Sequence, residues 1–359
     1  MKIFVNGYWN NNLGDDLFLK TLLERYNNHI FYIIANKSYR LKFNKYRNLR
    51  VINYNFINKV SDKLSSIFNR SIFFSNGRKI LNNLSGKDAY CELGGSLFML
   101  PKQGMDLNYS VRNKVCREKI PYFIIGSNFG PYFNQVQLDK YGGFFSKSYG
   151  TVFRDKKSYR LFPNDNVDYA PDVVFNLKVE KYLKNSKKDY ILISVINPSK
   201  KLNDLEKENK YLNYLKFVIG DYLSRGEKIV LMSFCKSEGD LQFANHLKNM
   251  FDSNNISVYD YKNIDSALFV INNAKKIIAT RYHAMILAWK LNKPVFVISY
   301  SEKTNNVIKY CFPKQHFINI RDINSRSSYK MPLFSINNDV RNLSLLADQQ
   351  FKYLDNFLR

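Results

Sequence analysis

The sequence has no apolar run of about 18 residues, the length that a helix needs to span a membrane. Its first residues, MKIFVNG, become polar too soon for a signal peptide and are typical of a first strand. The four cysteines are scattered, with no C-x-x-C pair and no Cys/His cluster of zinc spacing. The four histidines are scattered as well, so no metal site is expected. These absences predict a protein of the reducing cytoplasm.

Acidic residues are scarce: 30 Asp and Glu stand against 55 Lys and Arg, for a formal net charge of +25. Such a charge attracts nucleic acid, anionic lipid headgroups and phosphorylated substrates. The densest basic run, residues 36–50, interleaves aromatic side chains in a way that suits nucleic acid stacking or a membrane interface. No nucleic-acid-binding motif accompanies it, and we interpret it as a solvated connection between two strands. Codon bias in an AT-rich genome is a second explanation for the charge.

The length of 359 residues is comfortable for two domains. Short apolar runs alternate with helical patterns, which favours βαβ units and parallel sheets. Residues 176–189 are charged and weakly patterned, and we interpret them as a linker. We therefore expect an α/β protein with two Rossmann-like domains, 1–178 and 190–335, and a cleft between facing strand ends. A helix within 336–359 is expected to pack back on the N-terminal domain. This is a glycosyltransferase-B-like arrangement.

The segment ATRYHAMILAW, residues 279–289, carries the strongest chemical signal. An apolar strand pattern ends there and a helical pattern begins, so Arg281 and His283 lie where a strand passes into a helix N-terminus. In open α/β sheets this edge binds ligands, and the helix dipole favours anions. A guanidinium suits carboxylate or phosphate, and a histidine exchanges a proton near neutral pH. The segment predicts acid–base chemistry on an anionic substrate, although a histidine at a helix start is more often a cap.

The loop after the first expected strand contains Gly7, Asn12, Gly14 and Asp15. Its glycines permit a close approach of the backbone, and Asp15 or Asp16 can cap the following helix. A plain strand-to-helix turn explains the same residues, so the loop is weak support for a site when taken alone.

Two further loops follow strands in the first half of the chain. Gly94, Gly95 and Ser96 can present backbone N–H groups to an anion, and a tight turn is an equal alternative. Arg154 closes another strand and is expected to point into the cleft. The alternatives for Arg154 are a structural contact with Asp155 or a solvated basic turn.

In content and order, these segments resemble the polysaccharide pyruvyl transferase family, which includes the ketal-pyruvate transferases of cell-surface glycans. The matching segments are Gly7-Tyr8 to Asn12-Leu13-Gly14-Asp15, Gly94–Phe98, the strand leading to Gly130-Pro131, Arg154-Asp155 with Ser158-Tyr159, Ala170-Pro171-Asp172, Arg281-Tyr282-His283, and Pro294-Val295 with Tyr300 and Lys303. Each motif is loose, and their order over most of the chain is the specific signal. The chain departs from many relatives in an Asn-rich first loop, in Asp16 where they have Glu, and in two glycines at Gly94-Gly95 where they have three.

The resemblance implies phosphoenolpyruvate as donor and a sugar of a cell-surface polysaccharide or of its lipid-linked precursor as acceptor. The products would be a pyruvate ketal and phosphate. It also implies donor binding by Arg154, Arg281 and Lys303 and proton transfer by His283, with no metal or other cofactor. From the cysteine pattern, the net charge and the missing motifs, we expect a cytoplasmic location, peripheral contact with an anionic membrane at its inner face and no specific nucleic acid partner. A nucleotide-sugar glycosyltransferase of the same fold and a basic scaffold on membrane or nucleic acid are the alternatives.

Overall fold

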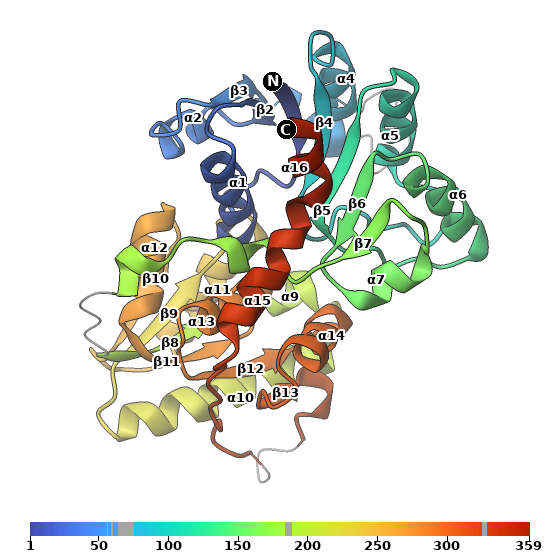
Figure 1. Cartoon of the computed structure of the whole chain (residues 1–359). Helices are drawn as coiled ribbons and strands as arrows, with labels where there is room; N and C mark the ends of the chain where they lie inside the picture. Colours follow the sequence, from blue (N-terminus) through green and yellow to red (C-terminus); the bar gives the residue numbers. More distant parts are fainter. Residues whose placement is uncertain (56, 59, 64–74, 184–188, 325–328) are drawn as a thin grey trace. The chain divides into compact units, whose positions relative to one another are not determined.

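The computed structural model describes the whole chain except residues 56, 59, 64–74, 184–188 and 325–328 (Figure 1). Part of the expected linker therefore lies outside the described residues. The chain forms two compact units: unit 1 comprises Met1–Trp9, Phe18–Val173 and Leu345–Arg359, and unit 2 comprises Asn10–Leu17 and Val174–Ser344. Chain order alone places Asn10–Leu17 with unit 1, whereas its contacts belong to unit 2.

Unit 1 is built on a parallel sheet with the strand order β3-β2-β1-β4-β5-β6-β7. Its strands are β1 Lys2–Asn6, β2 Ile30–Ala35, β3 Leu49–Asn53, β4 Ala89–Leu93, β5 Tyr122–Ser127, β6 Gly150–Phe153 and β7 Val167–Tyr169. The helices along this part of the chain are α1 Leu13–Arg25, α2 Ser38–Lys42, α4 Ser75–Asn82, α5 Leu107–Arg117, α6 Gln135–Phe145 and α7 Lys156–Leu161. Every residue of β4 and β5 is buried, as expected for central strands of a parallel sheet that helices cover.

Unit 2 repeats this plan with the strand order β10-β9-β8-β11-β12-β13. Its strands are β8 Tyr190–Ser194, β9 Ile229–Ser233, β10 Ile256–Asp260, β11 Ala274–Ala279, β12 Val295–Ser299 and β13 Phe317–Asn319. Its helices are α8 Glu180–Leu183, α9 Pro198–Lys201, α10 Leu205–Ser224, α11 Asp240–Lys248, α12 Ile264–Asn273, α13 Tyr282–Lys290 and α14 Glu302–Cys311, with short 3-10 turns η2 Val173–Asn176, η3 Lys236–Glu238 and η4 Ile320–Asp322. The two parallel-sheet α/β domains expected from the sequence are confirmed.

The order of the strands decides where a ligand can bind in each unit. Successive strands are added towards one side of the sheet and then towards the other. The change of side falls between β1 and β4 in unit 1 and between β8 and β11 in unit 2, and we call this place the reversal point. Because all pairs in both sheets are parallel, the carboxyl ends of the strands meet at one edge. Ligands of doubly wound sheets bind beyond this edge at the reversal point.

A single helix was expected in the C-terminal segment, but the structure divides it into three parts. It consists of α15 Val340–Ala347, the 3-10 turn η6 Asp348–Phe351 and α16 Lys352–Leu358, and α16 lies against β6 in unit 1 (Figure 1). Gln350 lies in the 3-10 turn. Its Oε1 accepts a hydrogen bond from the Gly126 amide at 2.8 Å, and its Nε2 donates to the Ala170 carbonyl at 2.7 Å.

The basic run at residues 36–50 connects β2 to β3 and exposes most of its basic residues, as expected from the sequence, but part of it is packed. It contains α2, and Tyr39 and Phe43 are buried with their rings stacked at 5.8 Å between centroids. The run is therefore anchored by its aromatic residues. Among the described residues, no helix is both long and apolar enough to cross a membrane.

Candidate functional site

Arg281 lies at the strand reversal point of unit 2, directly after β11. Ser194, at the end of the neighbouring strand β8, accepts hydrogen bonds at Oγ from the backbone N–H groups of Thr280 at 3.0 Å and Arg281 at 3.2 Å. The Tyr211 hydroxyl donates to Thr280 Oγ1 at 3.0 Å. These bonds hold the passage from β11 into α13 against the end of β8.

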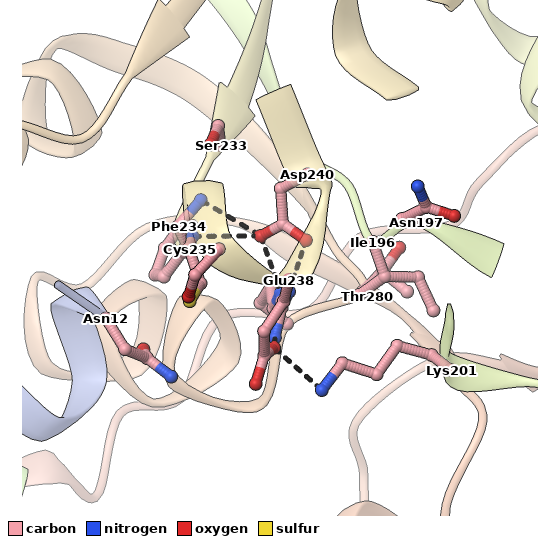
Figure 2. A network of polar contacts seen from close by, with 12 residues as sticks. Asn12, Ile196, Asn197, Lys201, Ser233, Phe234, Cys235, Glu238, Asp240 and Thr280 are labelled. Atoms are coloured by element: carbon pink, nitrogen blue, oxygen red, sulfur yellow. Dashed lines mark hydrogen bonds and ion pairs between the residues drawn. The ribbon is translucent and has the colours of Figure 1, made fainter. Parts of the chain in front are cut away.

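The Arg281 guanidinium is buried and held by Asp240, the first residue of α11. Arg281 donates from Nε to Asp240 Oδ2 at 2.8 Å and from a terminal nitrogen to Oδ1. Asp240 Oδ2 also accepts from the backbone N–H groups of Phe234 at 3.2 Å and Cys235 at 3.0 Å (Figure 2). Burial raises the pKa of the Asp240 carboxyl, and Arg281 offsets only part of this effect.

Glu238 supplies a second carboxylate to the same guanidinium. Its Oε2 accepts from the other terminal nitrogen of Arg281 and lies 2.7 Å from Nζ of Lys201, which ends α9 (Figure 2). Burial acts to raise the pKa of Glu238, but Arg281 and Lys201 outweigh it, so the pKa lies below its ordinary value. Lys201, Glu238, Arg281 and Asp240 form one network, which we call the Arg281 network.

His283 lies in the first turn of α13, and its imidazole packs on Gly14. A Cβ added to Gly14 would lie 1.8 Å from Nδ1 of His283, so a residue with a side chain does not fit there unless the ring moves. The segment that carries Gly14 is held to unit 2 through its backbone, because Leu13 N–H donates to the Phe234 carbonyl at 3.1 Å.

The first turn of α1 is capped by Asn12, not by Asp15 or Asp16 as the sequence suggested. Asn12 precedes the helix, and its Oδ1 accepts from the Gly14 amide at 3.1 Å. Asp15 and Asp16 lie inside the first turn, where a negative charge complements the helix dipole. Asp16 is fully buried and accepts a hydrogen bond from the Tyr261 hydroxyl at 2.6 Å.

Lys303 lies in the first turn of α14. Its Nζ is 5.9 Å from the ring centroid of Tyr282, the residue between Arg281 and His283. The rings of Tyr282 and His283 are perpendicular at 5.0 Å between centroids. Three of the residues that the sequence analysis singled out, Arg281, His283 and Lys303, therefore gather around the start of α13.

Unit 1 has a second polar cluster at the carboxyl edge of its sheet. Arg154 is buried and pairs through one terminal nitrogen with Asp172 Oδ2 at 3.0 Å, while the other donates to Asn128 Oδ1 at 2.9 Å. A Cβ on Gly95 would lie 2.5 Å from the Arg154 guanidinium, and the Gly95 carbonyl accepts from the Asn128 amide at 2.8 Å. The Gly-Gly loop and Arg154 thus pack together.

The alternatives considered for Arg154 are wrong, because it is neither solvated nor paired with Asp155. Asp155 instead caps α7 by accepting from the Ser158 amide at 2.9 Å. Gly94, with φ of 141°, lies in the backbone region that favours glycine. The hydroxyl of Ser96 donates to Asn128 Oδ1 at 3.2 Å.

The predicted site residues are divided between the two units. Gly7 contributes to unit 1 by its lack of a side chain, since a Cβ there would lie 2.6 Å from the Leu93 carbonyl oxygen. Unit 1 holds Gly7, Gly94, Gly95, Ser96 and Arg154, and unit 2 holds Asn12, Gly14, Asp15, Arg281, His283 and Lys303.

Sequence reasoning did not identify Lys201, Glu238 or Asp240. The sequence contained one usable signal, since Glu238-Gly239-Asp240 follows an apolar strand and opens a helix, as the Arg281 segment does. Pairing these acids with Arg281 required knowing which strand ends are neighbours. In the part of the chain that the structure describes, no group of three or more His, Cys, Asp or Glu side chains is arranged to hold a metal ion.

Solved structures similar to this chain share its fold at low sequence identity. They include the UDP-GlcNAc 2-epimerases of Methanocaldococcus jannaschii (10% identity, 97% of this chain and 100% of the other, TM-score 0.57) and Rickettsia bellii (14%, 99% and 96%, 0.57), and Anabaena HepE with UDP and glucose (10%, 99% and 96%, 0.54). Among curated proteins, none matches the sequence significantly. The family model described as polysaccharide pyruvyl transferase matches residues 12–302, a range that includes Arg154, Arg281 and His283. The chain belongs to the polysaccharide pyruvyl transferase family.

Proposed function

We propose that this protein transfers the pyruvyl group of phosphoenolpyruvate to two hydroxyls of a sugar in a cell-surface polysaccharide or its lipid-linked precursor. The observation that carries the proposal is the convergence of Arg281, His283 and Gly14 at the strand reversal point of unit 2, inside the segment that matches the family. This edge is where doubly wound sheets bind ligands. A guanidinium and an imidazole there suit a donor that carries a carboxylate and a phosphate.

Donor binding is assigned to Arg281, Lys303 and Arg154. Arg281 lies two residues before His283 in the chain, and Lys303 lies 5.9 Å from the ring centroid of Tyr282, the residue between them, so both cations lie at the start of α13 in unit 2. Arg154 is assigned from the family resemblance, and its buried pairing with Asp172 fixes its guanidinium in one orientation. A fixed guanidinium loses little conformational freedom when an anion binds. No metal or further cofactor is part of the proposal, because cationic side chains can neutralise the phosphate.

His283 is assigned as the general acid. Transfer of its proton to C3 of the enol makes C2 cationic, and a sugar hydroxyl then forms the first C2–O bond. Cleavage of the bond from C2 to the phosphate oxygen releases phosphate, and a second hydroxyl forms the other C2–O bond. The two hydroxyl protons replace the proton delivered to C3 and the one taken by phosphate, so the ketal and phosphate account for all atoms.

The proposed acceptor and the net charge of the protein together suggest where it works. Lipid-linked saccharides are presented at a membrane surface, and the net charge of +25 supports peripheral contact with anionic lipids at its inner face. A cytoplasmic location is part of this proposal. Contact of this kind weakens as salt rises, because surface charges are screened beyond about 10 Å at 0.1 M salt.

The donor is tested by calorimetric titration with phosphoenolpyruvate and, separately, with UDP-, GDP- and CMP-sugars at moderate salt. Saturable phosphoenolpyruvate binding that weakens at least tenfold in Arg281→Lys is expected, since lysine keeps the charge beside Asp240 but loses the planar fork. Arg154→Lys is the corresponding variant in unit 1, and it should also weaken the binding of phosphoenolpyruvate. The solved structures with UDP make the nucleotide-sugar arm necessary. Binding of a nucleotide sugar alone would mean that the protein is a glycosyltransferase of this fold.

The role of His283 is tested by His283→Asn with a phosphate-release assay and a sugar acceptor. Turnover should fall roughly 10²–10⁴-fold while the affinity for phosphoenolpyruvate is kept, because a general acid acts in the reaction more than in binding. Asparagine is smaller than the imidazole and cannot clash with Gly14. Turnover close to that of the unmodified protein would remove His283 from the mechanism.

A further inference from the structure

The two carboxylates that contact Arg281 are held very differently. Asp240 has a fully buried side chain and accepts two bonds from Arg281 and two from backbone N–H groups. Glu238 keeps 17% of its side chain exposed and lies in a single 3-10 turn, η3. Asp240 is therefore a permanent partner of the guanidinium, whereas Glu238 can leave at a lower cost.

Glu238 places one oxygen between two cations. Its Oε2 is 2.7 Å from Nζ of Lys201 and also accepts from Arg281. An ammonium and a guanidinium that converge on one oxygen resemble the surroundings of a bound phosphate or carboxylate oxygen. Lys201 lies in α9, the helix that follows β8, and Arg281 directly follows β11, so the two cations come from segments after the two strands that border the reversal point of unit 2.

The charges of the Arg281 network favour exchange of this carboxylate for another anion. Its two cations and two carboxylates sum to zero, so removing Glu238 leaves a local charge of +1. Gly239 separates Glu238 from Asp240 and has φ of 86°. Glycine is free to change this backbone conformation, so Glu238 can turn away while Asp240 stays in place.

We propose that Lys201 and Arg281 form an anion subsite for an oxygen of the donor, and that the Glu238 carboxylate occupies it until the donor displaces it. The inference rests on the proposed function in that the donor is phosphoenolpyruvate. The subsite takes an oxygen of a phosphate or a carboxylate, both of which this donor carries. Lys201 is thereby a donor-binding residue, and Glu238 is an internal competitor that weakens donor binding.

The test is calorimetric titration of four proteins with phosphoenolpyruvate, inorganic phosphate and pyruvate. Glu238→Gln should bind phosphoenolpyruvate roughly tenfold more tightly than the unmodified protein, because a bond to a charged competitor no longer has to be broken. Lys201→Met should weaken the binding of phosphoenolpyruvate. The double variant, Lys201→Met with Glu238→Gln, should not show the tighter binding of Glu238→Gln. The phosphate and pyruvate titrations identify which group of the donor takes the subsite.

Glu227→Gln is the matched control. Glu227 also pairs with a lysine, Lys275, and has a similar exposed fraction of 27%. It precedes β9, whereas Glu238 follows it, and five residues of strand separate the two ends by about 17 Å. The substitution makes the same change in net charge, so an equal gain in affinity in Glu227→Gln would mean a general field effect and would overturn the proposal. Thermal melts of each variant confirm that it is folded.

The outcomes separate this inference from the proposed function. Phosphoenolpyruvate binding that depends on Arg281 but is unchanged in Glu238→Gln would leave the function standing and refute the subsite. A gain for inorganic phosphate or pyruvate in Glu238→Gln that Lys201→Met abolishes, without any phosphoenolpyruvate binding, would establish the subsite and reject the proposed donor. No binding of any of the three anions to folded Glu238→Gln would refute the subsite as well.

Discussion

The imidazole of His283 lies on the α-carbon of Gly14, so close that a Cβ at Gly14 would be 1.8 Å from Nδ1 and 2.5 Å from Cε1. The two residues belong to the first turns of α13 and α1. In the sequence they belong to two separate loops, 269 residues apart. Their contact means that the position of the proposed general acid is set by the loop after the first strand of the chain.

Gly14→Ala should displace the His283 ring and lower turnover at least tenfold, because a misplaced general acid transfers its proton poorly. Alanine is favoured over glycine within a helix by up to about 1 kcal/mol, so loss of helix propensity cannot explain a loss of activity. Steady-state kinetics of phosphate release measure the effect. Gly143→Ala in α6, where an added Cβ meets nothing within 4 Å, is the control and should keep full activity. Equal turnover in the two variants would contradict a functional contact between Gly14 and His283.

Glu238→Gln should lower the free energy of unfolding near neutral pH by about 1–3 kcal/mol, since it removes a carboxylate that two cations contact. The pKa of Glu238 is lowered in the folded state from 4.5, so its stabilising contribution is complete above that pH. Below pH 4.5 the unfolded chain takes up the proton first, and the contribution falls until the folded carboxyl is protonated too. The difference between the two proteins should therefore shrink as the pH falls from 5 towards 3.

The measurement for Glu238 is urea denaturation of both proteins across this pH range. Asp240 has a raised pKa, with the opposite sign of pH dependence. Burial is the main cause and is the same in both proteins, and the Glu238 charge adds a smaller part, so most of the Asp240 contribution cancels in the difference. A difference that stays constant or grows at acidic pH would contradict the ionised pairing of Glu238 with Arg281 and Lys201.

Asp172→Asn should destabilise the protein by about 3–5 kcal/mol, because it leaves the buried Arg154 guanidinium without its charged partner. Asp168→Asn is the matched control in the same unit. Asp168 pairs with Lys352 at a partly exposed position, where a salt bridge contributes about 0–1 kcal/mol. Urea denaturation compares the two variants. Similar small losses in both would mean that the Arg154–Asp172 pair is not buried in solution.

Gln350→Ala should cost about 2–3 kcal/mol, because it leaves the buried Gly126 amide and the Ala170 carbonyl without a side-chain partner. Gln349→Ala, one residue earlier and exposed, should change stability by less than about 0.5 kcal/mol. Thermal melts and limited proteolysis of the C-terminal segment report both effects. Equal stability of the two variants would mean that Gln350 does not anchor this segment to unit 1.

Local patterns are sufficient to identify many of the strands. Three of them are apolar runs bounded by polar or turn residues, which indicate buried strands directly: Ile30–Ala35, Gly150–Phe153 and Val295–Ser299. Several helices cannot be identified in this way, because their local signals conflict. The helix α6 contains Gly142-Gly143, a pair typical of a turn, and α14 contains two asparagines of low helix propensity. Packing of their buried faces outweighs these preferences.

The sequence by itself determined the class of fold and the placement of each motif after a strand. Both properties depend on periodicity and on short segments, which are local. The tertiary structure decided which residues meet: Asp240 and Glu238 with Arg281, Asp172 with Arg154, and Gly14 with His283. Strand order brings the first two sets together at one edge of a sheet, whereas Gly14 meets His283 because the segment Asn10–Leu17 packs with unit 2. Burial then makes the pairing of each charge obligatory, because an unpaired buried charge is too costly for a stable fold.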